Sequence, residues 1–421
     1  MELKRVVVTG LGALTPIGND VEQTWTNAKN GVSGAGPITH FDASKFKTQF
    51  ACEVKNFTPS DHFDRKTERQ LDLYAQYALV AARQAIADSG INDESVDHTR
   101  VGVIVAAGIG GLHTFEEEAG YYAVNGETMG PKYNPFFIPK MIADIASGHI
   151  SMEFGFYGPN YGVVSACASS NNAIIDAFNY IRLGKADAFV TGGAEAAIFP
   201  AGVGGFNAMR ALSTRNESPE TASRPFSKSR DGFVIGEGSA ILVLEELEHA
   251  KARGAKIYAE IVGGGMSADA YHITATHPDG LGAILAMKMA LEDANLKPED
   301  IDYINVHGTS TPKGDISEIK AIVEVFGDAA YKLNISSTKS MTGHLLGATG
   351  ALEAMFSVKA VQEDIVPPTI NHEEDDKDEE IDYSLNFTFG KAQKRTVRAA
   401  LSNSFGFGGH NASVIVKKYE E

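Results

Sequence analysis

Short apolar runs alternate with longer amphipathic stretches along this chain, and that alternation restricts the fold more than any other feature. In the first half, buried strands are predicted at residues 4–10, 101–107 and 187–193. A helix with a broad apolar face is predicted over Leu71–Asp88, with Gly90 as its C-cap. The second half repeats this order, with strands predicted at residues 257–265, 301–308 and 333–338 and helices at 281–295 and 347–361. Such an order predicts an α/β protein with a mostly parallel sheet in each half.

The chain has 421 residues, which is long for a single hydrophobic core, so two packed halves are predicted. The boundary is placed near residues 250–255, where one strand and helix unit ends and another begins. This gives an N-terminal half, residues 1–255, and a C-terminal half, residues 256–421. No Pro/Ser-rich linker marks the boundary, so the halves are expected to pack tightly. The one strong charge run, residues 373–380, is interpreted as a solvated surface loop.

The formal net charge of -17 argues against nucleic acid as a partner. An acidic protein partner would therefore need a local basic patch on this chain. No apolar run is long enough to span a bilayer and no signal-peptide pattern opens the chain, so no membrane partner is expected. The two cysteines, Cys52 and Cys167, make no disulfide framework and indicate a reducing compartment. We therefore expect a cytoplasmic protein.

The segment at residues 163–170 reads VVSACASS and precedes a helix-like stretch, so Cys167 is predicted at a strand-to-helix turn. The positive end of a helix dipole favours the thiolate of a cysteine placed there. Small neighbours leave room for a substrate carbonyl, and the backbone N–H of Cys167 could donate to an oxyanion. A buried structural cysteine is the alternative, because free cysteine usually packs as a small hydrophobe. Cys52 has no such frame and is interpreted as structural.

Two histidines follow predicted strands in loops rich in small residues. His307 lies in VHGTSTP, and the hydroxyls of Thr309 and Thr311 suit an amide-rich substrate arm. His344 closes STKSMTGH, where Lys339 could share its site and Glu353, two turns further on, could pair with that lysine. Either histidine alone could be a satisfied structural residue. Two such loops together with a framed cysteine make that alternative much weaker.

A glycine-rich segment, NSFGFGGHN at residues 403–411, lies between two predicted strands near the C-terminus. Glycines around Phe407 would let the loop move and bring backbone N–H groups close to a ligand. An ordinary hairpin turn is the alternative. Two phenylalanines fit a simple turn poorly, because a turn gains little from bulky apolar side chains.

Together the segments SACASS, VHGTSTPKGD, STKSMTGHLLGATGALE and NSFGFGGHN resemble, in order and spacing, the elongating β-ketoacyl-acyl-carrier-protein synthases, most closely the synthase II type. The resemblance covers essentially the whole chain, including RVVVTGLGALTPIGN and SRPFSKSRDGFVIGEGSAILVLEE. It implies the thiolase-like fold, in which two similar halves form a five-layered αβαβα sandwich, usually as a homodimer. His410 is a departure, since threonine is common at that place in the family, and it puts the loop's polar contacts in doubt.

The resemblance also implies the catalytic residues. Cys167 would accept the acyl chain, and His307 and His344 would take the roles of the family's two active-site histidines. Lys339 and Glu353 match the family's supporting ion pair.

Three further residues match positions around the substrate. Phe407 corresponds to the residue whose N–H completes the oxyanion hole and whose ring gates the acyl pocket. Thr309 and Thr311 correspond to the threonines that hold the pantetheine arm. The implied reaction is the decarboxylative Claisen condensation of malonyl-acyl carrier protein with the acyl chain on Cys167, in fatty-acid elongation. Because decarboxylation supplies the carbanion, no cofactor and no metal is expected.

The implied partner is acyl carrier protein, which is acidic. The residues that resemble the family's basic docking contacts are Arg65, Lys66, Arg69 and Arg210, and scattered solvated charges are the alternative. Phe115, Phe136 and Phe137 are interpreted as core packing residues, with the acyl pocket or the dimer contact as the alternative.

Other classes of protein share features with this sequence. A thiolase needs a second active-site cysteine in a CxG context, which the C-terminal region lacks, and an initiating synthase pairs its cysteine with His and Asn. Residues 9–15, TGLGALT, give half of a dinucleotide-binding fingerprint without its third glycine. A cysteine peptidase does not suit the two histidine loops. A ketosynthase of a polyketide or aryl-polyene pathway, or a noncatalytic chain-length-factor-like subunit, also remains, although the latter usually lacks the nucleophilic cysteine.

Overall fold

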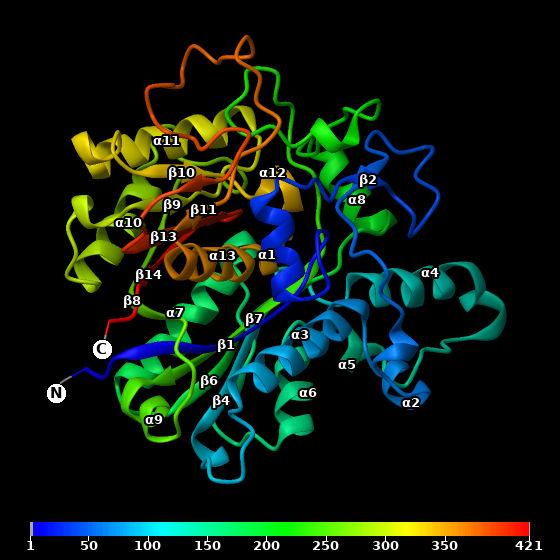
Figure 1. Cartoon of the computed structure of the whole chain (residues 1–421). Helices are drawn as coiled ribbons and strands as arrows, with labels where there is room; N and C mark the ends of the chain where they lie inside the picture. The colour runs from blue at the N-terminus through cyan, green and yellow to red at the C-terminus, as the bar shows by residue number, and fades with distance from the viewer. Residues whose placement is uncertain (1–2, 421) are drawn as a thin grey trace.

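The computed structural model describes residues 3–420, and its strands form one ten-stranded sheet built from two five-stranded halves (Figure 1). The first half has the order β1-β7-β6-β4-β5 and the second β8-β14-β13-β9-β10, so strands of equal rank occupy equal places in both. Only three residues of each edge strand join the halves, because β1 pairs with β8 through Val6–Val8 and 259–261. The two halves therefore share one topology.

The strands of the N-terminal half are β1 (Val6–Leu14), β4 (Val101–Ala106), β5 (Asn160–Tyr161), β6 (Ala188–Glu195) and β7 (Gly238–Glu246). Those of the C-terminal half are β8 (Ala259–Ala268), β9 (Tyr303–Asn305), β10 (Asn334–Ser336), β13 (Ala399–Gly406) and β14 (His410–Lys417). Each predicted strand overlaps one of these, although β9 and β10 are shorter than predicted. The smaller elements are α1 (Val21–Lys29), β2 (Gly36–Pro37), β3 (Phe50–Ala51), α2 (Arg65–Glu68), α5 (Phe137–Met141), α9 (Leu247–Ala252), α12 (Lys339–Thr342), β11 (Ile365–Val366) and β12 (Gln393–Lys394).

In each half four of the five strands run in one direction, so the prediction of a mostly parallel sheet in each half is confirmed, with one antiparallel strand as the exception. Strands β7 and β14 run antiparallel to both of their neighbours, whereas β4 and β9 pair in parallel on both sides. In the second half the cause is local, because a tight turn joins β13 directly to β14 and hairpin strands are antiparallel. An alternation of strands and helices does not reveal a strand that arrives without a crossover helix.

Helices cover both faces of each half-sheet and give five layers (Figure 1). The central layer consists of α7 (Ser169–Arg182) and α13 (Thr349–Glu363), which contact strands of both halves. The outer layers are formed by α3 (Leu73–Ser89) with α6 (Ile145–Phe154) and by α10 (Leu281–Asp293) with α11 (Pro312–Phe326). The prediction of a thiolase-like αβαβα architecture is confirmed.

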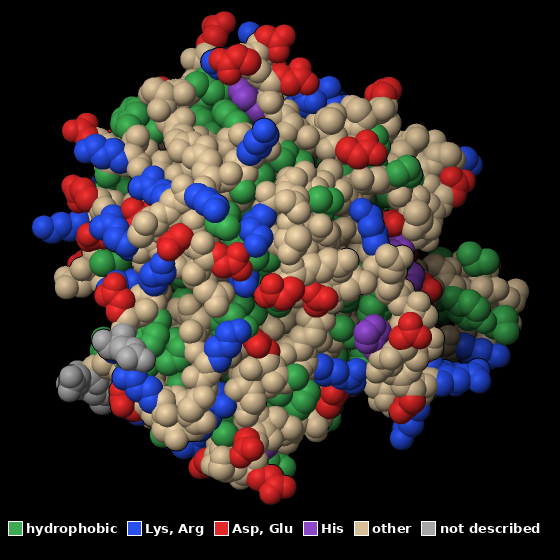
Figure 2. Space-filling view, viewed as in Figure 1, with side chains coloured by type: hydrophobic (Ala, Val, Ile, Leu, Met, Phe, Trp, Pro, Cys, Tyr) green, Lys and Arg blue, Asp and Glu red, His purple; other side chains and the backbone are tan. Residues whose placement is uncertain are grey.

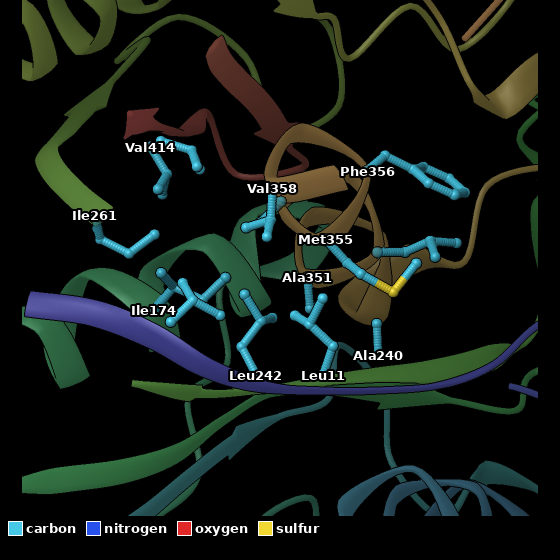
Figure 3. Packing of buried hydrophobic residues seen from close by; sticks show 14 of the residues in the cluster. Leu11, Ile174, Ala240, Leu242, Ile261, Ala351, Met355, Phe356, Val358 and Val414 are labelled. Atoms are coloured by element: carbon cyan, nitrogen blue, oxygen red, sulfur yellow. The ribbon is translucent and has the colours of Figure 1, made fainter. Parts of the chain in front are cut away.

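The largest hydrophobic core lies around the central helices (Figure 3). Ala351, Met355 and Val358 of α13 face Leu11 of β1, and all of these side chains are at most 2% exposed. Burial of a large aliphatic side chain contributes about 1.5–3 kcal/mol. Because α7 and α13 each begin beside a reactive segment, this core fixes the positions from which the site is built.

Gly10 and Gly12 allow β1 to lie directly against α3. A Cβ at Gly10 would lie 2.3 Å from the carbonyl oxygen of Ala85, and one at Gly12 would lie 1.9 Å from that of Ala81. Both glycines stand inside a buried strand and not in a strand-to-helix turn. They therefore allow close packing of the strand against the helix. The segment at residues 9–15 is thus not a dinucleotide-binding turn.

The helix α3 ends as predicted, because Gly90 adopts φ of 64° at its C-cap. At its start the Asp72 side chain accepts a hydrogen bond from the Tyr74 N–H. Among residues 3–420, no helix is long and apolar enough to cross a membrane.

A projecting arm carries α4 (Leu112–Met129), followed by α5, and its apolar side chains are not covered (Figure 2). Phe115 is 48% exposed and Phe136 is 38% exposed, so core packing is the wrong interpretation for both. Phe137 is half-buried. Of the α4 residues only Thr114 is buried, so the single chain leaves the apolar face of this arm open.

The acidic run at residues 373–380 is only partly a solvated loop. Asp376 accepts hydrogen bonds from the Ser229 N–H and hydroxyl and pairs with the buried Arg224, while Asp378 lies 2.8 Å from Nη1 of the buried Arg230. Two carboxylates of the run are thus anchors, because buried guanidinium groups need partners.

Candidate active site

Cys167 lies in the short 3-10 turn Ala166–Ala168, which leads directly into α7. The preceding Ala166 adopts φ of 51°, a left-handed conformation that is costly for a residue with a Cβ. Gly406 of β13 packs against this turn, since a Cβ there would lie 3.0 Å from the Cys167 nitrogen. The turn is therefore held in a strained form between α7 and the C-terminal half, with the thiol only 9% exposed.

His344 is the side chain nearest to the thiol. Its Nε2 lies 3.1 Å from the Cys167 Sγ, and its Nδ1 lies 2.8 Å from the Thr349 hydroxyl. The backbone of His344 is fixed by the Val234–Gly236 segment, which exchanges two hydrogen bonds with it. The imidazole is buried and is held on both sides, so its orientation toward the sulfur is set before any ligand binds.

His307 lies at the end of β9 beside His344, with ring centroids 5.3 Å apart in an edge-to-face arrangement. Its backbone N–H and that of Gly308 both donate to the Glu318 carboxylate at 2.8 Å. Its Nδ1 is buried and has no hydrogen-bond partner within the described residues. Glu318 therefore fixes the loop, while a ring nitrogen of His307 stays uncommitted.

Lys339 and Glu353 form an ion pair behind the histidines, with Nζ and Oε1 2.5 Å apart and both side chains at most 2% exposed. Burial raises the pKa of Glu353 above its usual range, and the Lys339 ammonium opposes that rise. A buried ion pair contributes little net stability but is costly to break. The pair fixes the Lys339 ammonium close to both histidines.

Burial lowers the pKa of both His307 and His344 well below the usual range, and the charge of Lys339 lowers each further. Both imidazoles are therefore neutral at neutral pH. A neutral imidazole carries one N–H donor and one acceptor nitrogen, and either role can be aimed at a substrate.

Burial raises the pKa of the Cys167 thiol to about 12. The Lys339 charge and the backbone N–H groups of Phe407 and Cys167 offset this rise only in part. Burial therefore opposes the thiolate that the start of a helix was expected to favour. The thiol must lose its proton to a neighbour as it reacts, and His344 is in place to take it.

A cavity of about 400 Å³ leads to Cys167, His307 and His344. Phe206, Phe233, Leu346 and Phe405 form its apolar wall. Thr309 and Thr311 line it as well, with hydroxyl oxygens 3.1 Å apart. The structure thus brings the predicted cysteine, histidines and threonines to a single cavity. An apolar cavity with a few convergent polar groups is the usual form of a ligand site.

Phe407 also lines the cavity, at the tip of the hairpin between β13 and β14. The turn uses Gly408 and Gly409 with φ of 87° and 76°, a conformation that other residues rarely adopt. The segment is therefore a hairpin turn and a cavity wall at once, and the two interpretations are not exclusive. His410 is exposed and does not line the cavity.

The four predicted docking cations are all exposed but fall in two places. Arg65 and Lys66 lie on α2, with Arg69 just after it. Arg210 stands between Met209 and Ala211, both of which line the cavity. Of these four cations only Arg210 adjoins residues that line the cavity, and the α2 cations are neither lining residues nor next to one in sequence.

Three polar residues escaped the sequence prediction. Glu318 and Thr349 hold the two histidine loops, and Glu195 accepts hydrogen bonds from the N–H groups of 108–110 and of Gly347. Burial raises the pKa of Glu195 to about 6, although those N–H groups oppose the rise. A carboxylate that accepts hydrogen bonds from the backbone of a distant segment leaves no local pattern in the sequence. Only Thr349 lies near its partner in sequence, five residues after His344.

Comparison with known proteins gives one consistent result. Residues 3–250 match the sequence model of the "Beta-ketoacyl synthase, N-terminal domain", and residues 258–373 match that of the "Beta-ketoacyl synthase, C-terminal domain". The chain is 50% identical to "3-oxoacyl-[acyl-carrier-protein] synthase 2" of Staphylococcus aureus strain N315, over 99% of each chain.

Solved structures agree with the sequence matches. The ishigamide ketosynthase/chain length factor superposes with a TM-score of 0.91 at 35% identity, covering 99% of this chain and 100% of that one. A type II polyketide acyl-carrier protein in complex with its hexaketide-bound ketosynthase, AntDE:AntF, gives a TM-score of 0.91 at 33% identity, with 99% and 100% coverage.

Proposed function

Because the chain belongs to the beta-ketoacyl synthase family, we propose that it is the 3-oxoacyl-[acyl-carrier-protein] synthase II of fatty-acid elongation. It condenses malonyl-acyl carrier protein with an acyl chain carried on Cys167 and releases 3-oxoacyl-acyl carrier protein and carbon dioxide. The observation that carries the proposal is the 3.1 Å contact between the Cys167 Sγ and the His344 Nε2 at the inner end of a mostly apolar cavity.

The first half-reaction loads the acyl chain. The Cys167 sulfur attacks the acyl thioester as its proton passes to the His344 Nε2, and the departing carrier thiol recovers that proton. The N–H groups of Cys167 and Phe407, which act on the sulfur in the resting protein, stabilise the oxyanion of the tetrahedral intermediate. One well-placed donor of this kind lowers the barrier by about 3–4 kcal/mol.

The second half-reaction decarboxylates malonate. Neutral His307 and His344 donate hydrogen bonds to the malonyl thioester carbonyl, where negative charge develops as carbon dioxide leaves. The resulting enolate carbon attacks the acyl thioester on Cys167 and releases the sulfur. His344 needs an Nε2 lone pair in the first half-reaction and an Nε2–H in the second. The Thr349 hydroxyl serves both tautomers, because a hydroxyl can donate to Nδ1 or accept from it.

Burial keeps both histidines neutral, and the Lys339 cation of the ion pair with Glu353 lowers their pKa further. Thr309 and Thr311 hold the pantetheine arm along the cavity wall. The proposed division of labour follows the two halves, with residues 1–255 supplying the nucleophile and residues 256–421 the histidines and the Phe407 hairpin. The short link between α9, which ends at Ala252, and β8, which begins at Ala259, is in keeping with that boundary.

Acyl carrier protein is the proposed partner, as the name of the related 3-oxoacyl-[acyl-carrier-protein] synthase 2 and the AntDE:AntF complex suggest.

A homodimer is also proposed, and the open apolar face of α4 and α5 is the surface that a second copy would cover (Figure 2). Its exposed members are Phe115, Tyr121, Tyr122, Val124, Met129, Tyr133, Phe136 and Ile138. Exposed apolar patches of this extent usually mark interfaces. The two free, buried cysteines suit a cytoplasmic location, which completes the proposal.

A ketosynthase of a polyketide pathway is the second candidate, because the ketosynthase of a type II polyketide complex superposes at 33% identity. The 50% identity to fatty-acid synthases favours the first candidate. Intact-mass spectrometry after incubation with acyl-acyl carrier protein and then malonyl-acyl carrier protein tests the proposal. One acyl adduct on Cys167 that discharges to 3-oxoacyl product supports it, and no adduct with any chain length refutes it.

A further inference from the structure

One cation of the cavity wall has no part in the steps above. Lys313 lies in the first turn of α11 and lines the cavity together with Cys167, Thr309 and Thr311. Its side chain is exposed. Within residues 3–420 it has no carboxylate within 4.0 Å, because Asp315, the acidic residue of the same turn, is buried and faces Arg230.

The position of Lys313 is electrostatically unfavourable in the free chain. A helix N-terminus carries positive partial charge, so acidic residues are preferred there and an unpaired lysine is opposed. Arg210, whose neighbours Met209 and Ala211 line the cavity, is also exposed and also lacks a carboxylate within 4.0 Å in the described chain. Lys313 is thus an unpaired cation in the cavity wall, and Arg210 is a second one next to lining residues, in a protein whose net charge is -17.

The segment from His307 to Lys313 runs outward from the reacting groups. Along it Thr309 is 8% exposed, Thr311 is half-buried and Lys313 is exposed. A ligand lying along this wall meets, in order, the thiol and imidazoles, a pair of hydroxyls and finally an ammonium. These groups match a ligand that carries a thioester at its inner end, amides in the middle and an anion at its outer end.

We propose that Lys313 binds the phosphate of a 4′-phosphopantetheine thioester at the cavity mouth and so gives the enzyme its preference for phosphorylated acyl donors. The inference rests on the proposed function and names a specificity residue within it. Lys313 neutralises the phosphate charge once the thioester has reached Cys167, and it stays in water when the site is empty.

The test compares two donors that differ only in that phosphate, an acyl-pantetheine and the same acyl-4′-phosphopantetheine. The quantity measured is the ratio of their kcat/KM values for acylation of Cys167, followed by intact mass. Lys313→Ala is expected to lower this ratio about three- to fivefold, the effect of losing one exposed charge pair. Lys313→Glu is expected to lower it further, Lys313→Arg to preserve it, and raised salt to shrink the wild-type ratio. Lys320→Ala, an exposed lysine on the same helix, is the matched control and is expected to leave it unchanged.

Two results overturn the inference. A wild-type ratio near one removes any phosphate preference, and equal losses on both donors in Lys313→Ala would mean that the lysine only supports the fold. Failure of the proposed function gives a different result, because then neither donor acylates Cys167 in the wild-type protein.

Discussion

The two cysteines are alike in their resting chemistry and differ in their surroundings. Cys52 is 1% exposed and Cys167 is 9% exposed, and burial raises the pKa of each thiol to about 12. The Cys52 sulfur packs against backbone, since a Cβ at Gly343 would lie 2.9 Å from it. The Cys167 sulfur faces the His344 Nε2 and a cavity. Neither burial nor resting pKa therefore separates a nucleophile from a packing residue; the neighbouring base and donors do.

The two thiols also lie next to consecutive residues of one loop. Cys52 supports Gly343, and the next residue, His344, contacts Cys167. Cys52 thus helps to position His344, whereas Cys167 is the group with which His344 reacts. Substitutions at Cys167, His344 and Cys52 can therefore test the difference between the two thiols.

The largest effect is expected from Cys167→Ala. Condensation should fall below about one thousandth of the wild-type rate, because the only thiol that lines the cavity is lost. Intact-mass spectrometry with acyl-acyl carrier protein should show no adduct. A normal adduct on another residue would contradict the assignment of Cys167.

His344→Ala should make the environment of Cys167 resemble that of Cys52. Malonyl decarboxylation is expected to fall about 10²- to 10³-fold, as for loss of one preorganised donor. Release of carbon dioxide from malonyl-acyl carrier protein measures this step, and the acyl adduct on Cys167 should still form slowly. His344→Gln keeps a donor and should recover part of the rate. Unchanged condensation in His344→Ala would remove this histidine from the mechanism.

Because the two thiols have the same pKa, their reactivity should depend on pH in the same way, but only Cys167 is accessible to a reagent from the cavity. Below a thiol pKa near 12 the thiolate fraction rises about tenfold per pH unit, so alkylation of Cys167 by iodoacetamide should rise about tenfold per unit between about pH 7 and 9. Cys52 should stay unmodified while the protein is folded, because its sulfur reaches no cavity. Peptide mass mapping after timed alkylation measures both. A rate that levels off near pH 7 would show a resting thiolate at Cys167.

The same contrast shows how far sequence reasoning reaches. The small-residue frame of SACASS distinguished Cys167 from Cys52, and the loops after two strands indicated His307 and His344, because local pattern encodes a turn at a strand end. The direction of β7 and β14 had no such signature. Nor did the burial that raises the pKa of Cys167, since desolvation depends on the whole packed structure.

Long-range polar contacts were equally invisible. Glu318 reaches the backbone of His307 from α11, and Glu195 joins the loop at 108–110 to Gly347 from β6. Both contacts arise from tertiary packing between elements that are distant in sequence. The sequence thus located the reacting atoms, and the structure was needed for what orients them.

The smallest effect is expected from Cys52→Ala. Loss of one buried sulfur should lower the free energy of unfolding by about 1 kcal/mol, while kcat/KM for condensation stays within about twofold. Gly343→Ala is the matched variant on the other side of the contact. It should cost more activity, because the glycine has φ of 66° and the new Cβ would meet the Cys52 sulfur. Urea unfolding and steady-state kinetics on both variants measure the two effects. If Cys52→Ala slowed condensation as much as His344→Ala, Cys52 would belong to the reacting group, and the distinction between the two thiols would fail.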